Sequence, residues 1–262
     1  MSGNRCVLIV WFLLLLGLSA CAKKEEPSKD TEPAPAATKP FVPGEMLLIP
    51  AGEFIFGDNE SPGFPRRKIM LPAFWIDKFE ATNGEYLDFT IKSGYVSEGQ
   101  TWRLFFTPEK VNAPVINITW NDASAYCKSV GKRLPSEEEW EKAARGSDGR
   151  RFPWGEKWER GRSNTFEEGL RNTANVNQFD DTSPYGVHDM LGNVQEWTSS
   201  WYQRRKGSSE QGETTFEGRL RTVRGASSNI YGSKGHLWDR SGYLPAALYG
   251  IGCRCAKDAT PR

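Results

Sequence analysis

The sequence predicts an α+β fold in which loops outweigh regular secondary structure. The 262-residue chain contains 26 glycines and 10 tryptophans, and few of its stretches keep a helical periodicity for long. Glycines mark turns and irregular backbone, and large aromatic side chains anchor such backbone against a core. With 38% hydrophobic and 12% aromatic residues, a chain of this length can bury a sizeable core. We therefore expect one globular domain, or at most two.

Strand patterns open the predicted domain. Residues 45–58, EMLLIPAGEFIFGD, alternate and then turn on Gly57 and Asp58, which predicts a pair of hairpin strands. Residues 68–82, KIMLPAFWIDKFEAT, form a further strand region. From Phe152 to the end we expect turns and short strands without long elements.

The first predicted helix lies in residues 82–94, TNGEYLDFTIKSG. Thr82 and Glu85 have the spacing of a capping box, and Gly94 is placed to end the helix. The apolar positions of this helix are Tyr86, Phe89 and Ile91.

The second predicted helix lies in residues 121–134, NDASAYCKSVGKRL, where Asn121 or Asp122 caps the start and Gly131 ends it. Apolar residues recur at helical spacing, which predicts one buried face. These residues are Ala123, Tyr126, Cys127 and Val130.

The third predicted helix lies in residues 134–146, LPSEEEWEKAARG, with Ser136 capping against Glu139 and Gly146 at its end. Its inward positions are Trp140, Ala143 and Ala144. Acidic residues in the first turn suit the positive end of the helix dipole. We therefore interpret residues 137–139 as a solvated helix start and not as a catalytic pair of carboxylates.

The first residues predict an exported lipoprotein. Residues 1–20 have one arginine, an apolar run from Cys6 to Leu16 and small residues before Cys21, as in a signal peptide. The sequence LSAC resembles the bacterial lipobox, after which Cys21 becomes the lipidated N-terminus. A plain signal peptide or an uncleaved anchor is the alternative.

Residues 21–43 are charged and proline-rich, which predicts a disordered tether, and residues 44–262 form the predicted domain. Ala22, and not aspartate, follows the lipidation site. By resemblance to other lipoproteins, this predicts a lipid-anchored protein of the bacterial cell envelope, in the outer membrane and facing the periplasm.

Charge and motif content exclude several classes of function. With 34 basic and 33 acidic residues the net charge is +1, so we expect no nucleic-acid partner. The sequence has no HExxH, no GxSxG and no glycine-rich phosphate loop, which removes support for common hydrolases and nucleotide-binding proteins. The two histidines, His188 and His236, do not predict a zinc site or a catalytic triad.

Several stretches, taken in order, resemble one family. They are MLLIPAGEFIFG, FWIDKFEATNGEYLDF, PVINITWNDASAYCKSVGKRLPSEEEWEKAARG, RRFPWGE, GVHDMLGNVQEWTSSWY, VRGAS and IGCRCAKD, between Glu45 and Lys257. This order is similar to that of the formylglycine-generating enzyme (sulfatase-modifying factor) family. The resemblance implies a single α+β domain that is related to C-type lectin-like domains and stabilised by calcium. The enzymes of the family oxidise a sulfatase cysteine to formylglycine with molecular oxygen and copper(I), which two cysteines bind.

The resemblance implies a disulfide between Cys127 and Cys255, and an oxidising compartment would permit it. Cys253 stands where the family has phenylalanine, so we interpret it as a small buried hydrophobic residue. The alternative is a copper or thiol-redox pair of Cys253 and Cys255, because soft thiolates suit copper(I). We do not expect copper.

The resemblance also implies a calcium site in the stretch DMLGNVQEW. Hard oxygen ligands on a tight glycine turn suit calcium, and the alternative is a hydrogen-bonded turn without a metal. Its ligands would be Asp189, Gly192, Val194 and Glu196. A second family site begins at Asn175 and Val176, but its acidic loop is shortened, and we do not expect Asp180 or Asp181 to replace it.

Two functions of different class remain. The first is a non-oxidase binding or structural module whose partner is an unidentified envelope protein or peptide, and the second is a formylglycine-generating oxidase. The enzymes have two cysteines just after RGGS, whereas this chain reads RGASSNIYGSKG from Arg224, with Ile230 and Gly235 near those positions. The family tryptophan before the calcium glutamate is Gln195. The ergothioneine-type relatives need a further N-terminal domain, for which we find no room.

Overall fold

The structure is a computed structural model that describes residues 41–59, 65–203 and 218–259. These residues fall within one unit, Thr38–Arg262. No helix among them is long and apolar enough to cross a bilayer. The predicted signal peptide, Cys21 and most of the predicted tether, up to residue 40, lie outside the described residues.

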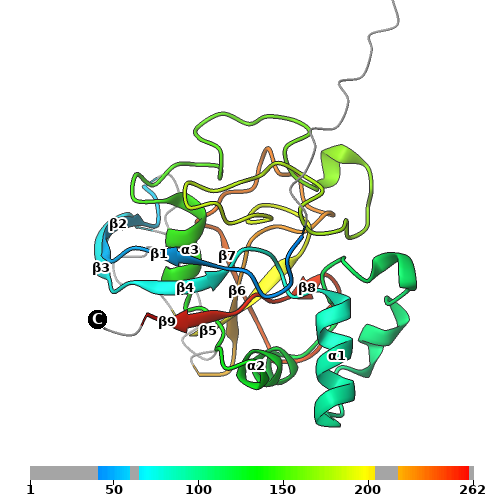
Figure 1. The fold of residues 1–262 in the computed structure, drawn as a ribbon. Helices are drawn as coiled ribbons and strands as arrows, with labels where there is room; N and C mark the ends of the chain where they lie inside the picture. The colour runs from blue at the N-terminus through cyan, green and yellow to red at the C-terminus, as the bar shows by residue number, and fades with distance from the viewer. Residues whose placement is uncertain (1–40, 60–64, 204–217, 260–262) are drawn as a thin grey trace, which may run out of the picture. The chain divides into compact units, whose positions relative to one another are not determined.

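One antiparallel sheet joins the start of the described domain to its end. Its strands, in order across the sheet, are β1 (Met46–Ile49), β4 (Phe74–Asp77) and β9 (Ala256–Asp258). Trp75 in the central strand pairs with Leu48 on one side and with Lys257 on the other. Figure 1 shows the three strands side by side. Pairing between segments this far apart in sequence holds both ends of the domain together.

A two-stranded hairpin follows β1. It consists of β2 (Gly52–Phe56) and β3 (Arg67–Leu71), with Phe54 opposite Ile69. The hairpin predicted within residues 45–58 is therefore wrong in its partners, because β2 pairs with β3 while β1 pairs with β4. Alternation along a short stretch indicates that a strand forms but does not name its neighbour.

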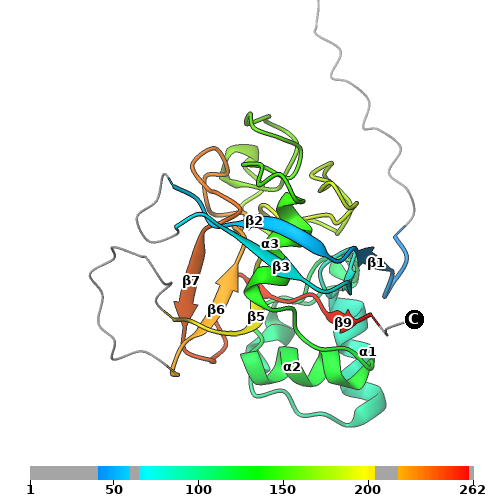
Figure 2. The same ribbon diagram turned by 90° about the vertical axis from the view of Figure 1, so that its left-hand side faces the viewer.

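A four-stranded sheet is built from the second half of the chain. In order across the sheet, its strands are β7 (Arg240–Tyr243), β6 (Arg221–Arg224), β5 (Gln195–Trp201) and β8 (Ile251–Gly252). The β5–β8 pair is parallel and the other pairs are antiparallel. Figure 2 shows β7, β6 and β5 together. These short strands agree with the expectation for the region after Phe152.

Capping boxes start two of the helices where they were predicted. In α1 (Asn83–Ser93) the side chain of Thr82 accepts the amide of Glu85, and Glu85 caps back. In α3 (Glu137–Arg145) Ser136 and Glu139 do the same. Gly94 ends α1 in the left-handed conformation, with φ 68°, which glycine adopts without strain. α3 contacts β2 as well as β5 and β6, so it lies between the hairpin and the four-stranded sheet (Figure 2).

The second helix, α2 (Trp120–Ser129), starts earlier than predicted. Its N-cap is Thr119, whose hydroxyl accepts the amide of Asp122, while Asp122 accepts the amide of Thr119. The prediction of Asn121 or Asp122 as the cap was therefore wrong. Asp122 has the role that glutamate has in the other two capping boxes.

The core consists of two clusters of buried side chains. The first packs around α1, α2 and the segment that holds Cys253 and Cys255, and the second packs around α3, β4 and residues 187–191. The largest buried aromatic side chains are Trp102, Trp140 and Trp197. Tryptophan thus anchors the irregular parts of the chain, as the composition predicts.

Several side chains are exposed or buried contrary to what their residue type or sequence pattern suggests. Ile91 is 69% exposed, because it lies two residues beyond Phe89 and so on another side of α1. Val130 is 46% exposed, because it caps α2 after the last helical turn. The interpretation of residues 137–139 as a solvated helix start is wrong for Glu137 and Glu139, which are buried. Glu139 pairs with Arg133, with 2.7 Å between Oε2 and Nη1.

Candidate functional site

The loop after β6 carries Ile230 and Gly235, where the resemblance places the oxidase cysteines. Arg224, at the end of β6, is fully buried and links this loop to α3 by an ion pair and a hydrogen bond. Its Nη2 donates to Glu141 Oε2 at 2.6 Å and to the carbonyl oxygen of Leu237 at 2.7 Å. The arginine of the RGAS stretch is thus a structural ion-pair partner at the base of the loop.

Glu167 holds the tip of the same loop. Its carboxylate accepts the backbone amides of Gly232 and Ser233, each at 2.9 Å, and the hydroxyl of Thr165 at 2.7 Å. Burial raises the pKa of Glu167, but the hydrogen bonds from Ser233 and Thr165 outweigh burial and lower it to about 2. A Cβ on Gly232 would lie 2.4 Å from the ring of Trp158. The loop is therefore packed and hydrogen-bonded in a conformation that needs glycine at this position.

Glu196 and Asp189, the two carboxylates of the predicted calcium site, both lie beside Arg254. The Glu196 carboxylate accepts Arg254 Nη2 at Oε1 and Arg254 Nε at Oε2, both at 2.7 Å. Trp140 Nε1 donates to Oε2 at 2.9 Å. Arg254 also donates to the carbonyl oxygen of His188 at 2.8 Å. A fully buried bidentate ion pair thus joins the C-terminal segment to β5.

Two further carboxylates are buried around this pair. Glu80 accepts Asn193 Nδ2 at 2.7 Å and the amide of Val194 at 3.3 Å, and Asp181 accepts the amide of Asp189 at 2.6 Å. Burial raises the pKa of Glu80 and of Asp181 well above the usual range, and that of Asp189 to about 6. Neighbouring carboxylates add to the effect.

Sequence reasoning did not identify Glu80, and it named Asp181 only as a substitute ligand for another site. A signal for Glu80 was present, because it is an acidic residue between Phe79 and Ala81 in a strand-type stretch. Charged residues are seldom fully buried unless they are paired or hydrogen-bonded. Periodicity alone does not reveal what the partner is.

The residues of the predicted calcium site fit the ion in part. Asp189 and Gly192 have left-handed backbone, with φ 57° and 98°, and a Cβ on Gly192 would lie 2.5 Å from the carbonyl oxygen of Asn164. The carboxylate of Asp189 and the carbonyl oxygens of Gly192 and Val194 are hard donors of the kind that calcium prefers. Glu196 fits less well, because both of its carboxylate oxygens already accept hydrogen bonds, from Arg254 and Trp140. The described residues contain no group of three or more His, Cys, Asp or Glu side chains placed to hold a metal ion.

The residues named for a second calcium site have different surroundings. Asn175 is exposed, whereas Val176 is buried and donates its amide to Asn112. Asp180 is exposed, and Asp181 faces the amide of Asp189.

The structure joins Cys127 on α2 to Cys255 by a disulfide, which is the pair that the resemblance implies. Among the described residues Cys253 is the free cysteine, and its side chain is fully buried. Burial raises the pKa of the Cys253 thiol well above its usual value. It packs in the core cluster that includes Tyr86 and Tyr126. The thiol is thus in the protonated, enclosed state of a packing residue.

The two histidines lie in different surroundings. His188 packs on Phe79, and burial lowers its pKa to about 4, with further lowering from Lys78. His236 stacks on Trp238, with 4.5 Å between ring centroids. The structure does not bring the two together.

Comparison with known proteins identifies the family. Residues 30–259 match the Sulfatase-modifying factor enzyme 1-like domain. The chain belongs to this family. The resemblance drawn from the motifs is confirmed, and so is the α+β fold with limited regular secondary structure that it implied.

Relatives named as formylglycine-generating enzymes and relatives named as inactive forms have similar sequence identity to this chain. The inactive Cα-formylglycine-generating enzyme 2 of Mus musculus is 31% identical, over 82% of this chain and 86% of the relative. The formylglycine-generating enzyme of Bos taurus is 29% identical over 94% and 83%, and that of Streptomyces coelicolor is 31% identical over 89% and 95%. Overall identity therefore does not separate an oxidase from an inactive family member.

Solved structures share the fold. PvdO from Pseudomonas aeruginosa superposes with a TM-score of 0.66 at 24% identity, covering 82% of this chain and 94% of that one. Treponema denticola variable protein 1 superposes with a TM-score of 0.67 at 19% identity, covering 85% and 99%. At these identities the likeness concerns the fold alone.

Proposed function

We propose that this sulfatase-modifying factor family member is a non-oxidase binding or structural module of the cell envelope. The observation that carries the proposal is the loop after Arg224, which has Ile230 and Gly235 near the positions of the two enzyme cysteines. Copper(I) is a soft ion that prefers thiolate ligands, and an isoleucine and a glycine supply none. The oxidase is the alternative function.

The remaining thiol is poorly placed to replace the missing pair. Cys253 is fully buried in the core with a raised pKa, so it does not present a thiolate to copper, oxygen or a substrate cysteine. Cys255 is already in a disulfide. In addition, the Glu167 carboxylate accepts hydrogen bonds from the amides of Gly232 and Ser233. These contacts support a loop that serves as a fixed surface.

We expect no conversion of a sulfatase cysteine to formylglycine. The full chain, supplied with copper(I) and oxygen, is incubated with a peptide that contains Cys-x-Pro-x-Arg, and mass spectrometry follows the aldehyde. A formylglycine-generating enzyme run in parallel shows that the assay works. Aldehyde formation that disappears in Cys253→Ser would contradict the proposal and make that thiol catalytic.

The module is exported and anchored through Cys21 in this proposal. The lipobox-like LSAC ends at Cys21, and a charged, proline-rich segment separates it from the domain. A partner is then an envelope protein or peptide within reach of the tether. Metabolic labelling with a palmitate analogue should mark the wild type and not Cys21→Ser, and equal labelling of both would refute the anchor.

Calcium is the proposed cofactor, held by Asp189 and the carbonyl oxygens of Gly192 and Val194. Four buried carboxylates lie around Arg254, namely Glu80, Asp181, Asp189 and Glu196. A buried surplus of carboxylates over cations is costly, and a bound divalent cation would offset it.

The pH dependence of calcium binding follows from the pKa of Asp189. This pKa is raised from 3.8 to about 6 in the folded protein. Protonated Asp189 therefore stabilises the folded protein fully below pH 3.8, and this contribution is lost as the pH rises through about 6. Without calcium, Tm should fall as the pH rises through about 6.

Added calcium should raise Tm more at alkaline than at acidic pH. At a hundredfold excess over Kd, the gain in the free energy of unfolding should be about 2.7 kcal/mol. Differential scanning fluorimetry with EDTA or calcium tests both expectations. Asp189→Asn should lose the calcium response and part of the pH dependence. If EDTA leaves the Tm of both proteins unchanged, the turn binds no calcium.

A further inference from the structure

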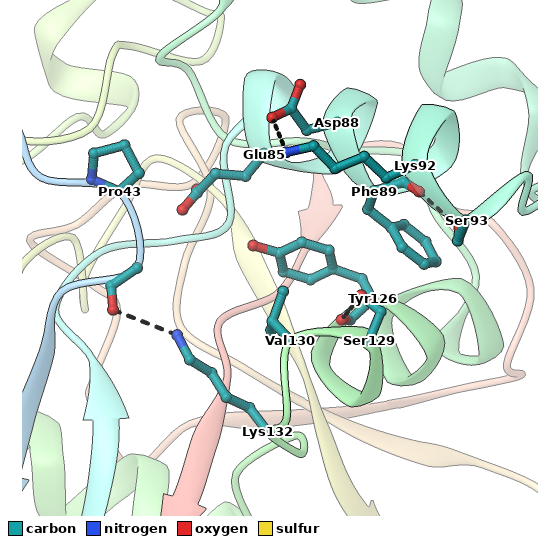
Figure 3. A pocket seen from close by; sticks show the side chains of 11 residues that line it. Pro43, Glu85, Asp88, Phe89, Lys92, Ser93, Tyr126, Ser129, Val130 and Lys132 are labelled. Atoms are coloured by element: carbon teal, nitrogen blue, oxygen red, sulfur yellow. Dashed lines mark hydrogen bonds and ion pairs between the residues drawn. The ribbon is translucent and has the colours of Figure 1, made fainter.

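A cavity of about 390 Å³ lies between α1, α2 and the loop at Pro43 and Gly44 (Figure 3). None of these elements belongs to the loop after Arg224 or to the buried cluster around Arg254. What the cavity binds is therefore independent of whether the domain lacks oxidase activity.

Glu85 contributes an unpaired negative charge to this cavity. One of its oxygens, Oε2, accepts the amide and the hydroxyl of Thr82, at 2.9 and 2.8 Å. Both donors are neutral, and no described lysine, arginine or histidine forms an ion pair with Glu85. A carboxylate in this position still attracts a cation.

The other charges at the cavity are already paired. Lys92 Nζ lies 2.9 Å from Asp88 Oδ2, and Lys132 Nζ lies 2.5 Å from Asp77 Oδ1. Lys92 and Asp88 offset each other's charge at an exposed position, and Lys132 is held by the mostly buried Asp77. The charge that remains is that of Glu85.

The hydroxyl of Tyr126 points into the same space, on the side of Glu85 (Figure 3). The ring is 5% exposed and packs against Phe89, with 5.8 Å between centroids. No hydrogen bond to a described residue satisfies the hydroxyl. The hydroxyl thus opens to the cavity, where it is available to hydrogen-bond a ligand with a polar end.

The rest of the wall contains apolar side chains and two serines, Ser93 and Ser129, whose hydroxyls already donate to backbone carbonyl oxygens of α1 and α2. Val130 is 46% exposed although its sequence pattern predicts burial, and it lines the cavity together with Pro43. The methyl groups of Val130 and the ring of Pro43 offer contact to a short aliphatic chain.

We propose that the cavity binds a primary ammonium group on a short aliphatic chain, either a free amine or the lysine side chain of a partner. The ammonium donates to Glu85 and to the oxygen of Tyr126, while the chain lies against Val130. A neutral polyol would lack the attraction to the unpaired carboxylate, and an anion would meet it as a like charge.

Calorimetric titration of the full chain in detergent, with three five-carbon probes, tests the proposal. Cadaverine should bind, whereas pentanediol and glutarate should not. In Glu85→Gln the Kd for cadaverine should weaken by about tenfold or more, because the ammonium then meets a neutral amide in place of a carboxylate. Glutamine is also found in capping boxes, so this variant should keep α1 and an unchanged Tm.

Tyr126→Phe keeps the ring packing and should weaken the Kd by a smaller factor, about threefold. The control is Glu53→Gln, which removes an exposed carboxylate of β2 that pairs with Lys68, away from the cavity. It should bind cadaverine like the wild type.

A titration with Nα-acetyl-lysine methylamide distinguishes the two sources of the amine. Tighter binding than that of cadaverine identifies a peptide lysine as the ligand, and weaker binding identifies a free amine. The proposal is overturned if cadaverine does not bind, if pentanediol binds equally well, or if Glu85→Gln and Glu53→Gln show the same Kd.

Discussion

Arg254→Met should lower the free energy of unfolding by about 3–5 kcal/mol, because it removes one partner of a buried ion pair and leaves the other buried. Arg254 and Glu196 are both fully buried, and two hydrogen bonds of 2.7 Å join them. Methionine fills much of the volume of the arginine stem, so the loss measures charge and hydrogen bonding more than packing.

The effect should extend beyond Glu196. The positive charge of Arg254 also acts on Glu80, Asp181 and Asp189, whose pKa values burial already raises. Without the guanidinium, the ionised forms of all four carboxylates lose a favourable neighbour. The damage should therefore be smaller at pH 5 than at pH 8, since protonation removes the charges that the substitution leaves behind.

Urea unfolding at both pH values measures this loss, with two comparisons. Arg133→Met removes a half-exposed arginine that pairs with Glu139 and Asp258 and should cost less than about 1 kcal/mol. The double variant Glu196→Gln/Arg254→Met should recover part of the loss, because glutamine can still accept the indole N–H of Trp140. Equal destabilisation by Arg254→Met and Arg133→Met would show that the buried pair is not a main support of the fold.

Local signals predicted the helices better than they predicted the sheets. A capping box lies within four residues, so Thr82 with Glu85 and Ser136 with Glu139 can be read from the sequence. The cap at Thr119 follows the same rule, but aspartate takes the place of glutamate and Asn121 competes as a cap by type. By contrast, the partner of β1 is β4, and β4 then pairs with β9 near the end of the chain. Such long-range pairing depends on tertiary packing and leaves no local pattern.

The site could be predicted only as far as the resemblance extended. The resemblance supplied Asp189 and Glu196, together with the disulfide partners. It did not reveal that Arg254 donates hydrogen bonds to the Glu196 carboxylate, or that Glu80 is a further buried carboxylate. These contacts join segments far apart in the sequence, and residue types alone do not reveal them. Val130 shows the opposite case, since its apolar pattern predicted the core but its side chain lines a cavity.

Loss of the Cys127–Cys255 disulfide should destabilise the domain by about 5 kcal/mol in the chain-entropy model. The bond closes a loop with a sequence separation of 128, and both cysteines are fully buried. Opening it gives the unfolded chain more conformations, and in the folded state it releases the C-terminal segment from α2. Urea unfolding of Cys127→Ala/Cys255→Ala measures the effect.

Cys253→Ala is the matched control, because it removes a buried sulfur from the same core without opening a covalent loop. It should cost about 1 kcal/mol, as expected for a small cavity. Peptide mapping of the wild type without reductant should recover the Cys127–Cys255 link. A Cys127–Cys253 link would contradict the pairing. If the double variant were no less stable than Cys253→Ala, packing alone would hold the C-terminal segment, and the bond would contribute little to stability.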